Sequence, residues 1–167
     1  MNIFIPAMIA VLLAEFGGRA MSLLRLPRLA LAATLLGLSI GGAAFVGASL
    51  APTMNAHARA LMLGIAFILT GFSQFGKAKP LRFPERVLGT LRFIWGSGAP
   101  FLAFAFSIWS GSPLGAAAGA LAGIAGVVAL GAVPMAAGSI MWLRRLAGII
   151  LTSTGLYAAL WALRLIG

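Results

Sequence analysis

Long runs of apolar residues, each interrupted by only a few polar positions, make up almost the whole chain. Six such runs can be traced, and each is close to the roughly 20 helical residues that cross a bilayer core. A segment in lipid must satisfy its own backbone hydrogen bonds, and these runs are too long and too continuously apolar for barrel strands. We therefore predict six helices, over residues 3–24, 29–50, 58–75, 87–109, 114–137 and 141–166.

The composition supports an all-α integral membrane protein. Of the 167 residues, 62% are hydrophobic and 8% are charged, whereas a soluble domain has roughly 25% charged residues. The net charge of +10 could suggest nucleic acid, but the basic residues lie in short clusters between the apolar runs. Such clusters orient helices in a membrane. We expect the lipid bilayer as the main partner and no nucleic acid.

The basic clusters also predict a topology. Eight basic residues follow the first, third and fifth runs, and two lie on the opposite side: Arg25, Arg28, Lys77, Lys79, Arg82, Arg86, Arg144 and Arg145, against Arg59 and Arg164. Because the more basic side is cytoplasmic, we expect a multi-pass protein of a bacterial inner membrane with both termini outside the cytoplasm.

A repeated glycine motif indicates two related halves. The segments Gly64–Gly71 and Gly148–Gly155 both read Gly-Ile, four residues, then Thr-Gly, at an offset of 84 residues. We predict a first three-helix repeat over residues 1–76, a basic cytoplasmic linker over 77–86 and a second three-helix repeat over 87–167. An odd number of helices per repeat makes the two an inverted pair, the arrangement of many secondary transporters, whose substrate sites lie at the midplane.

The second and fifth predicted helices are both rich in glycine, which suits close helix packing. These glycines are Gly37, Gly41, Gly42 and Gly47 in the former, and Gly119, Gly123, Gly126 and Gly131 in the latter.

Glu15 is the first candidate functional residue, because it lies well inside the first apolar run. A charge near the centre of a membrane helix costs about 2.5–3.5 kcal/mol on insertion scales, so a cation, a proton or a partner must offset it. Arg19 lies one helical turn further on the same face. Two interpretations stay open: a carboxylate that binds a cation or a proton, and a structural Glu15–Arg19 ion pair.

The matching place in the second repeat has no charge but an expected break. Pro100 has no amide proton and clashes with the carbonyl of Gly96, so we predict a kink that leaves this carbonyl unpaired. Ser97 and Gly98 allow the distortion and add a hydroxyl. Free carbonyls of a broken helix can coordinate cations, but an ordinary proline kink is the open alternative.

Other polar residues are weaker candidates. We expect Ser73 and Gln74 to cap the third helix or meet headgroups, and His57 to be solvated in the connection after the second helix. The tryptophans fall near helix ends and fit interfacial belts. The chain has no cysteine, phosphate loop, nucleophile elbow or clustered His/Glu site. We therefore expect neither an enzyme nor a cofactor. A membrane enzyme or lipid-binding protein stays open as an alternative, and it would need a polar catalytic cluster near residues 77–92.

The whole chain resembles the GDT family of small cation transporters, relatives of the Golgi manganese/calcium–proton exchangers within the lysine-exporter superfamily. That family carries the motif Glu-x-Gly-Asp-Lys/Arg-Thr/Ser in the first helix of each repeat. Here the first copy reads Glu15-Phe-Gly-Gly-Arg-Ala20, in which Glu15, Gly17 and Arg19 match. The second copy falls at Gly96-Ser-Gly-Ala-Pro-Phe101, in which only Gly98 matches.

The resemblance implies a transporter that exchanges a divalent cation such as Mn²⁺ or Ca²⁺ for protons, with Glu15 as the metal-binding carboxylate. Since hard cations take several oxygen ligands, Ser22, Ser97 or the Gly96 carbonyl would have to complete the shell. Arg19 would tune Glu15, and the stretch Gly96–Pro100 would supply neutral ligands. A transport-inactive relative that serves as a structural or accessory subunit stays open, and so does a homodimer.

Overall fold

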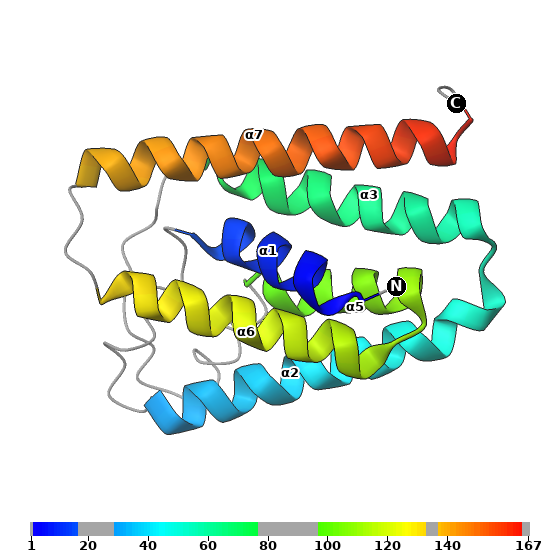
Figure 1. Cartoon of the computed structure of the whole chain (residues 1–167), viewed down its shortest axis with the longest axis horizontal. Helices are drawn as coiled ribbons and strands as arrows, with labels where there is room; N and C mark the ends of the chain where they lie inside the picture. Colours follow the sequence, from blue (N-terminus) through cyan, green and yellow to red (C-terminus); the bar gives the residue numbers. More distant parts are fainter. Residues whose placement is uncertain (1, 17–28, 77–96, 133–136, 165–167) are drawn as a thin grey trace.

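The computed structural model describes residues 2–16, 29–76, 97–132 and 137–164 (Figure 1). This part of the chain is helical throughout and contains no strand. Its elements are α1 (Phe4–Glu15), α2 (Leu29–Leu50), the short 3₁₀ helix η2 (Ala51–Thr53), α3 (Ala56–Ser73), α5 (Ala99–Ser110), α6 (Pro113–Gly131) and α7 (Ala137–Ala162).

Polar caps and one left-handed glycine set the ends of several helices. The Asn55 side chain accepts a hydrogen bond from the Ala58 amide at 2.7 Å and so caps the start of α3. Gly111 adopts φ 68° and ends α5, a conformation that costs glycine little. Ser112 then caps α6, one residue before Pro113. A short turn at Gly111 and Ser112 therefore connects α5 to α6.

The helix bounds agree with the apolar runs in part. Helix α2 has the predicted bounds, and α3 begins and ends two residues earlier than predicted. Helix α7 begins at Ala137, four residues earlier than predicted, and Arg144 and Arg145 lie inside it, as they do in the predicted helix over 141–166. Of the first and fourth predicted helices, the structure describes only α1 and α5, which cover one half of each.

The helices pack in three main pairs: α1 on α6, α2 on α5 and α3 on α7. In Figure 1, α1 and α5 lie between the longer helices, and the last turn of α1 and the first turn of α5 lie near the middle of the bundle's long axis. Glycines allow the backbones to approach. A Cβ added at Gly123 would lie 2.7 Å from the Met8 carbonyl oxygen of α1, and one at Gly47 would meet the Phe104 carbonyl of α5.

The prediction that glycines of the second helix suit close packing is thus right for Gly47 but wrong for three others. A Cβ at Gly37, Gly41 or Gly42 would have no atom of the described chain within 4 Å. These three glycines therefore lie on a part of the α2 surface that no described helix contacts.

Helices α3 and α7 touch through the two copies of the repeated motif, which we call the α3–α7 glycine contact: Gly64, Gly71, Gly148 and Gly155. A Cβ at Gly64 would lie 2.8 Å from the Gly155 carbonyl oxygen, and one at Gly71 would lie 2.9 Å from that of Gly148. The first glycine of each motif therefore faces the last glycine of the other. At Gly64, Gly71 and Gly155 an added Cβ would lie 2.6–2.9 Å from backbone atoms of the partner helix, so these three positions require glycine.

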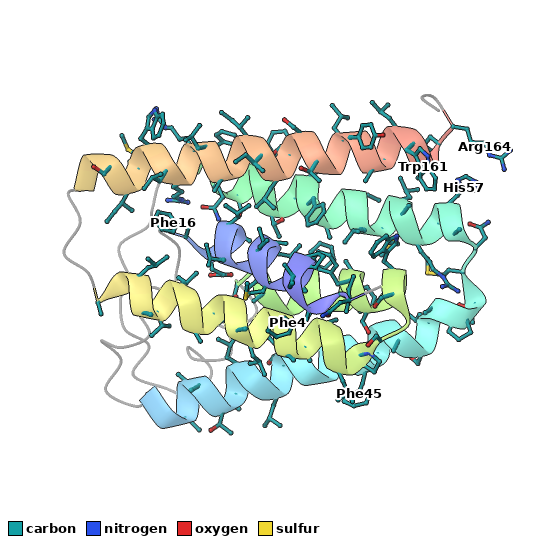
Figure 2. All side chains as sticks on the ribbon, in the orientation of Figure 1. Phe4, Phe16, Phe45, His57, Trp161 and Arg164 are labelled. Carbon is teal, nitrogen blue, oxygen red and sulfur yellow. The ribbon has the colours of Figure 1, made fainter. Side chains whose placement is uncertain are left out.

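The outside of the bundle is apolar. Large hydrophobic side chains such as Leu38, Phe45, Leu114 and Tyr157 are 59–72% exposed, and Figure 2 shows Phe45 pointing outward from α2. Four helices of the described chain, within residues 31–53, 56–73, 113–131 and 139–162, are long and apolar enough to cross a membrane. Apolar surface of this extent fits a multi-pass membrane protein and not a soluble one.

Candidate buried carboxylate site

The side chain of Glu15 joins the last turn of α1 to the first turn of α5. It is 3% exposed, although it carries a carboxylate. Its Oε1 accepts hydrogen bonds from the Ser97 hydroxyl and from the Gly98 amide, each at 2.7 Å. Segments separated by more than 80 residues in the chain therefore meet at this one oxygen.

Local backbone geometry creates this meeting point. Helix α1 stops at Glu15 because Phe16 leaves the helical region, with ψ at 124°. Helix α5 begins at Ala99, directly after the bend at Ser97 and Gly98, and its first intrahelical bond runs from the Leu102 amide to the Gly98 carbonyl. Both helices thus end inside the bundle rather than at its surface.

The expected role of Pro100 needs correction. We predicted that Pro100 would kink a continuous helix, but in the described chain it lies in the first turn of α5. In that position the missing amide proton costs nothing, because the first amides of a helix have no intrahelical acceptor. The proline therefore helps α5 to begin beside Glu15. The Gly96 carbonyl lies outside the described residues.

The electrostatics of the site favour a negative charge. The first turn of a helix carries roughly half a positive charge, and its free amides bind anions. The Ser97 hydroxyl strengthens this arrangement, since it donates to Glu15 and also accepts from the Ala99 amide at 3.3 Å. Glu15 is accordingly held by hydrogen-bond donors, as a deprotonated carboxylate requires.

Helix α3 closes one side of the site through Thr70. A Cβ at Gly98 would lie 3.0 Å from the Thr70 methyl carbon and 3.7 Å from Glu15 Oε1. The Thr70 hydroxyl bonds to the Ala66 and Phe67 carbonyls of its own helix, at 2.7 and 3.2 Å. Gly98 therefore gives α3 the room to approach, and a buried hydroxyl of α3 lies beside the carboxylate.

Gln74 and Arg144 extend the polar contacts next to Glu15. We expected Gln74 to cap α3 or to meet headgroups. It is the C-cap residue of α3, but its side chain is only 4% exposed, and its amide nitrogen donates to the Ala14 carbonyl in α1. Its Oε1 accepts from Arg144 Nε of α7 at 2.9 Å, and Arg144 Nη2 also donates to the Ser73 carbonyl at 3.1 Å. One glutamine thus links three helices. The only sequence signal for it is an amide at the end of an apolar run.

The predicted site residues divide into two groups. Four of them, Glu15, Ser97, Gly98 and Pro100, come together at the junction of α1 and α5. The other four, Gly17, Arg19, Ser22 and Gly96, lie outside the described residues, as does the expected Glu15–Arg19 ion pair.

A metal ion at this place would need neutral ligands. Among the residues that the structure describes, no group of three or more His, Cys, Asp or Glu side chains could hold a metal. Glu15 is the only acidic residue in that part of the chain. The Ser97 hydroxyl is a neutral oxygen that contacts Glu15, so any cation would be bound weakly unless water adds further ligands.

His57 does not lie in the connection after α2, where we expected a solvated histidine. It lies in the first turn of α3, its ring centroid is 5.4 Å from that of Trp161, and its Nε2 is 3.4 Å from Arg164 Nη2 (Figure 2). Its Nδ1 is buried without a hydrogen-bond partner in the described chain. The residue therefore belongs to the contact between the start of α3 and the end of α7, away from Glu15.

No family model matches the chain, and neither does any curated protein or solved structure.

Proposed function

We propose that this protein is a secondary transporter of a divalent cation such as Mn²⁺ or Ca²⁺, which it exchanges for protons at Glu15. The observation that carries the proposal is the buried carboxylate at the junction of α1 and α5, near the middle of the bundle. Two helices that end inside the membrane and an ionisable group between them are typical of transporter sites.

The packing pairs support an architecture of six helices in two inverted three-helix repeats. Helix α1 of the first unit packs on α6 of the second, and α5 of the second packs on α2 of the first. If the two units are interchanged, the α1–α6 pair takes the place of the α5–α2 pair. The α3–α7 glycine contact has the same property, because the first glycine of each motif faces the last glycine of the other. A two-fold axis in the membrane plane would produce this reciprocity.

The charge of the site supplies a coupling mechanism. The positive end of α5 and a bound cation cannot both neutralise Glu15 at close range, because they repel each other. Cation binding would therefore draw Glu15 away from Ser97 and Gly98, and a proton or the end of α5 would replace the cation later. Glu15 belongs to the first unit, and Ser97 and Gly98 belong to the second. Exchange at Glu15 would therefore move one unit against the other.

The packing also agrees with both termini on one side of the membrane. Phe4 begins α1 and Arg164 follows α7, and in Figure 1 both the start of α1 and the end of α7 lie toward the end of the bundle where α3 begins. With the basic clusters on the cytoplasmic side, we propose a bacterial inner-membrane protein with external termini.

Flux in proteoliposomes tests the proposed function. Vesicles loaded with a divalent-sensitive dye and a pH dye receive Mn²⁺, Ca²⁺ and a proton gradient in turn. We expect cation entry coupled to an opposite pH change, and we expect Glu15→Gln to abolish it. Glutamine keeps an oxygen that can accept from Ser97 and Gly98, so the fold should survive while the charge is lost. Ser97→Ala is the matched variant that keeps the carboxylate, and it should retain measurable flux.

A structural role for Glu15 is the second candidate, in a transport-inactive protein that serves as an accessory subunit. The favouring observation is that the Glu15 oxygen accepts from two donors, as an N-terminal cap of α5 would. In that case Glu15→Gln would lower the thermal midpoint or the yield of assembled protein. Well-folded wild-type protein without flux of any tested cation would reject the transporter and leave this second role.

A further inference from the structure

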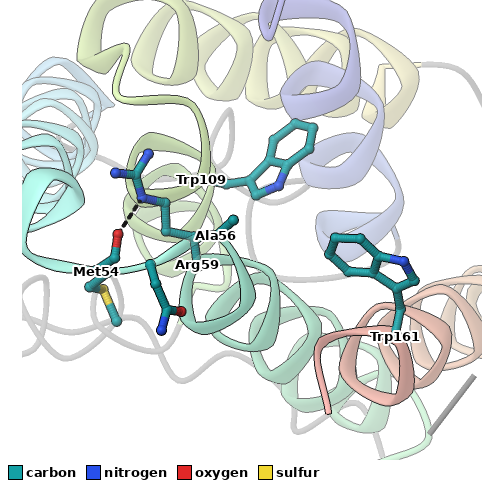
Figure 3. A pocket seen from close by; sticks show the side chains of 6 residues that line it. Met54, Ala56, Arg59, Trp109 and Trp161 are labelled. Carbon is teal, nitrogen blue, oxygen red and sulfur yellow. Dashed lines mark hydrogen bonds between the residues drawn. The ribbon is translucent and has the colours of Figure 1, made fainter. Parts of the chain in front are cut away.

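A cavity of about 410 Å³ opens at the end of the bundle where α3 begins and where α5 and α7 end. It is lined by Met54, Asn55, Ala56, Arg59, Trp109 and Trp161 (Figure 3). These residues come from the α2–α3 connection, from α3, from α5 and from α7, so the cavity depends on the assembled bundle. It lies at an end of α5 opposite to Glu15 and is a separate place in the fold.

The lining side chains offer hydrogen-bond donors and almost no free acceptors. Arg59 uses Nε for the Met54 carbonyl, at 3.0 Å, and no described residue bonds to its two terminal nitrogens. Asn55 uses Oδ1 to cap α3, which leaves its NH₂ group. Trp109 and Trp161 each add an indole N–H, a group that only donates.

The charge around the cavity is positive and uncompensated. None of the lining residues is acidic, and no ion pair to Arg59 occurs in the part of the chain that the structure describes. Arg164 is close to the cavity, because its amide donates to the Trp161 carbonyl and its Nη2 lies 3.4 Å from His57 Nε2. A guanidinium with free terminal nitrogens among donors attracts an anion with several oxygens, and its fork matches phosphate geometry.

The walls and the location indicate the rest of the ligand. Trp109 is the second-to-last residue of α5, and Trp161 is the second-to-last residue of α7. Indoles at helix ends mark the membrane–water interface. Figure 3 shows the two indoles on one side of Arg59 and the Met54 carbonyl on the other. Apolar walls beside a guanidinium at headgroup depth suit an amphiphile better than a fully hydrated ion.

We propose that this cavity binds the phosphate group of an anionic ligand at Arg59, with an anionic phospholipid headgroup or a soluble phosphate ester as its source. The site is independent of transport at Glu15 and would persist if the protein moved no cation.

Thermal unfolding of the purified full-length protein in detergent tests the site with three probes: dioleoyl phosphatidylglycerol, dioleoyl phosphatidylcholine and sn-glycerol 3-phosphate. We expect phosphatidylglycerol at saturating concentration to raise the midpoint by about 5 °C, since a ligand that binds only folded protein stabilises it. The zwitterionic lipid should give less than half this shift. A shift with glycerol phosphate as large as that with phosphatidylglycerol identifies a soluble ester; its absence identifies the lipid.

Two arginine variants separate the site from general charge. Arg59→Gln removes the guanidinium and should weaken phosphatidylglycerol binding by about tenfold or more, as expected for a charge-assisted hydrogen bond. Arg145→Gln removes an exposed arginine of α7 and should leave the shift unchanged. If Arg59→Gln does not fold, Trp161→Leu takes its place and should also reduce the shift. No shift with either phosphate probe, equal shifts for the two lipids, or a shift unaffected by the cavity variants would overturn the proposal.

Discussion

Three of the four buried polar side chains in the described part of the bundle form contacts between helices, whereas Thr70 bonds within its own helix. Glu15 bonds across to α5, Ser107 Oγ donates to the Ala44 carbonyl of α2 at 2.6 Å, and Gln74 links α3 to α1 and α7. In an apolar environment an unpaired polar group costs free energy, so each partner fixes the position of the other. These few residues therefore determine how the apolar helices register against one another.

Gln74→Leu should destabilise the protein, because it leaves the Ala14 carbonyl and Arg144 Nε without their present partner. We expect a loss of about 1–3 kcal/mol, the usual cost of an unsatisfied buried group. Thermal unfolding in detergent measures it. Ser73→Ala is the control, since Ser73 is exposed and bonds only to the Thr70 carbonyl of its own helix through its hydroxyl. Equal midpoints for the two variants would show that the Gln74 contacts contribute nothing to stability.

The sequence predicted part of this residue-level arrangement. A lone acid in an apolar run identified Glu15, and the break around Pro100 identified Ser97 and Gly98 as its counterpart. It could not predict Gln74, because a glutamine at a helix end looks the same whether it faces water or a neighbouring helix. It also could not predict that Pro100 starts α5, since a proline is compatible with both a kink and a first turn.

At the scale of the element, small residues decide which helix faces meet. In α6, Gly119 and Gly123 lie against the backbone of α1, and the α3–α7 glycine contact lies against backbone on both sides. Association in lipid depends on such close van der Waals packing, because lipid tails are as apolar as the side chains. The glycine positions were visible in the sequence, but the choice between a glycine that packs and one that faces lipid required the partner helix.

Gly155→Val should disrupt the packing of α3 on α7. Its Cβ would lie 2.6 Å from the Gly64 carbonyl oxygen and 2.8 Å from the Ile68 amide, so the helices must separate. We expect a loss of about 1–3 kcal/mol or more in unfolding free energy, the usual cost of overpacking. Unfolding by a denaturing detergent measures this loss. Gly42→Val, at an exposed position with no described atom within 4 Å of an added Cβ, is the control and should be nearly neutral. The same loss in both variants would mean that helix propensity, and not contact, explains it.

At the scale of the whole molecule, the bundle has two distinct ends. Met54 and Trp109 line one cavity, so the α2–α3 connection and the α5–α6 turn lie at the same end, whereas α7 begins at the other (Figure 1). Length and hydropathy predicted a membrane bundle because six runs of about 20 apolar residues leave no other fold. They could not predict where α1 and α5 end within the bilayer, since the apolar runs continue past both ends.

Because the chain has no cysteine, single introduced cysteines can show on which side of the membrane each end of the bundle lies. Single cysteines at Thr53 and Ser110 should react with a membrane-impermeant maleimide from the same side of the membrane, and one at Ser139 should react only from the other. All three positions are exposed in the structure. Basic clusters on the cytoplasmic side predict that Thr53→Cys is labelled in intact spheroplasts. Labelling of Ser139→Cys and Ser110→Cys from the same side would be incompatible with a crossing of the membrane by α6 between them.

The contact of α3 with α7 also orders the biosynthesis of the protein. Helix α3 leaves the ribosome well before α7, so Gly64 and Gly71 lack their α7 contact until α7 has been inserted. A chain truncated after α6 would therefore expose backbone at these two glycines that α7 covers in the bundle.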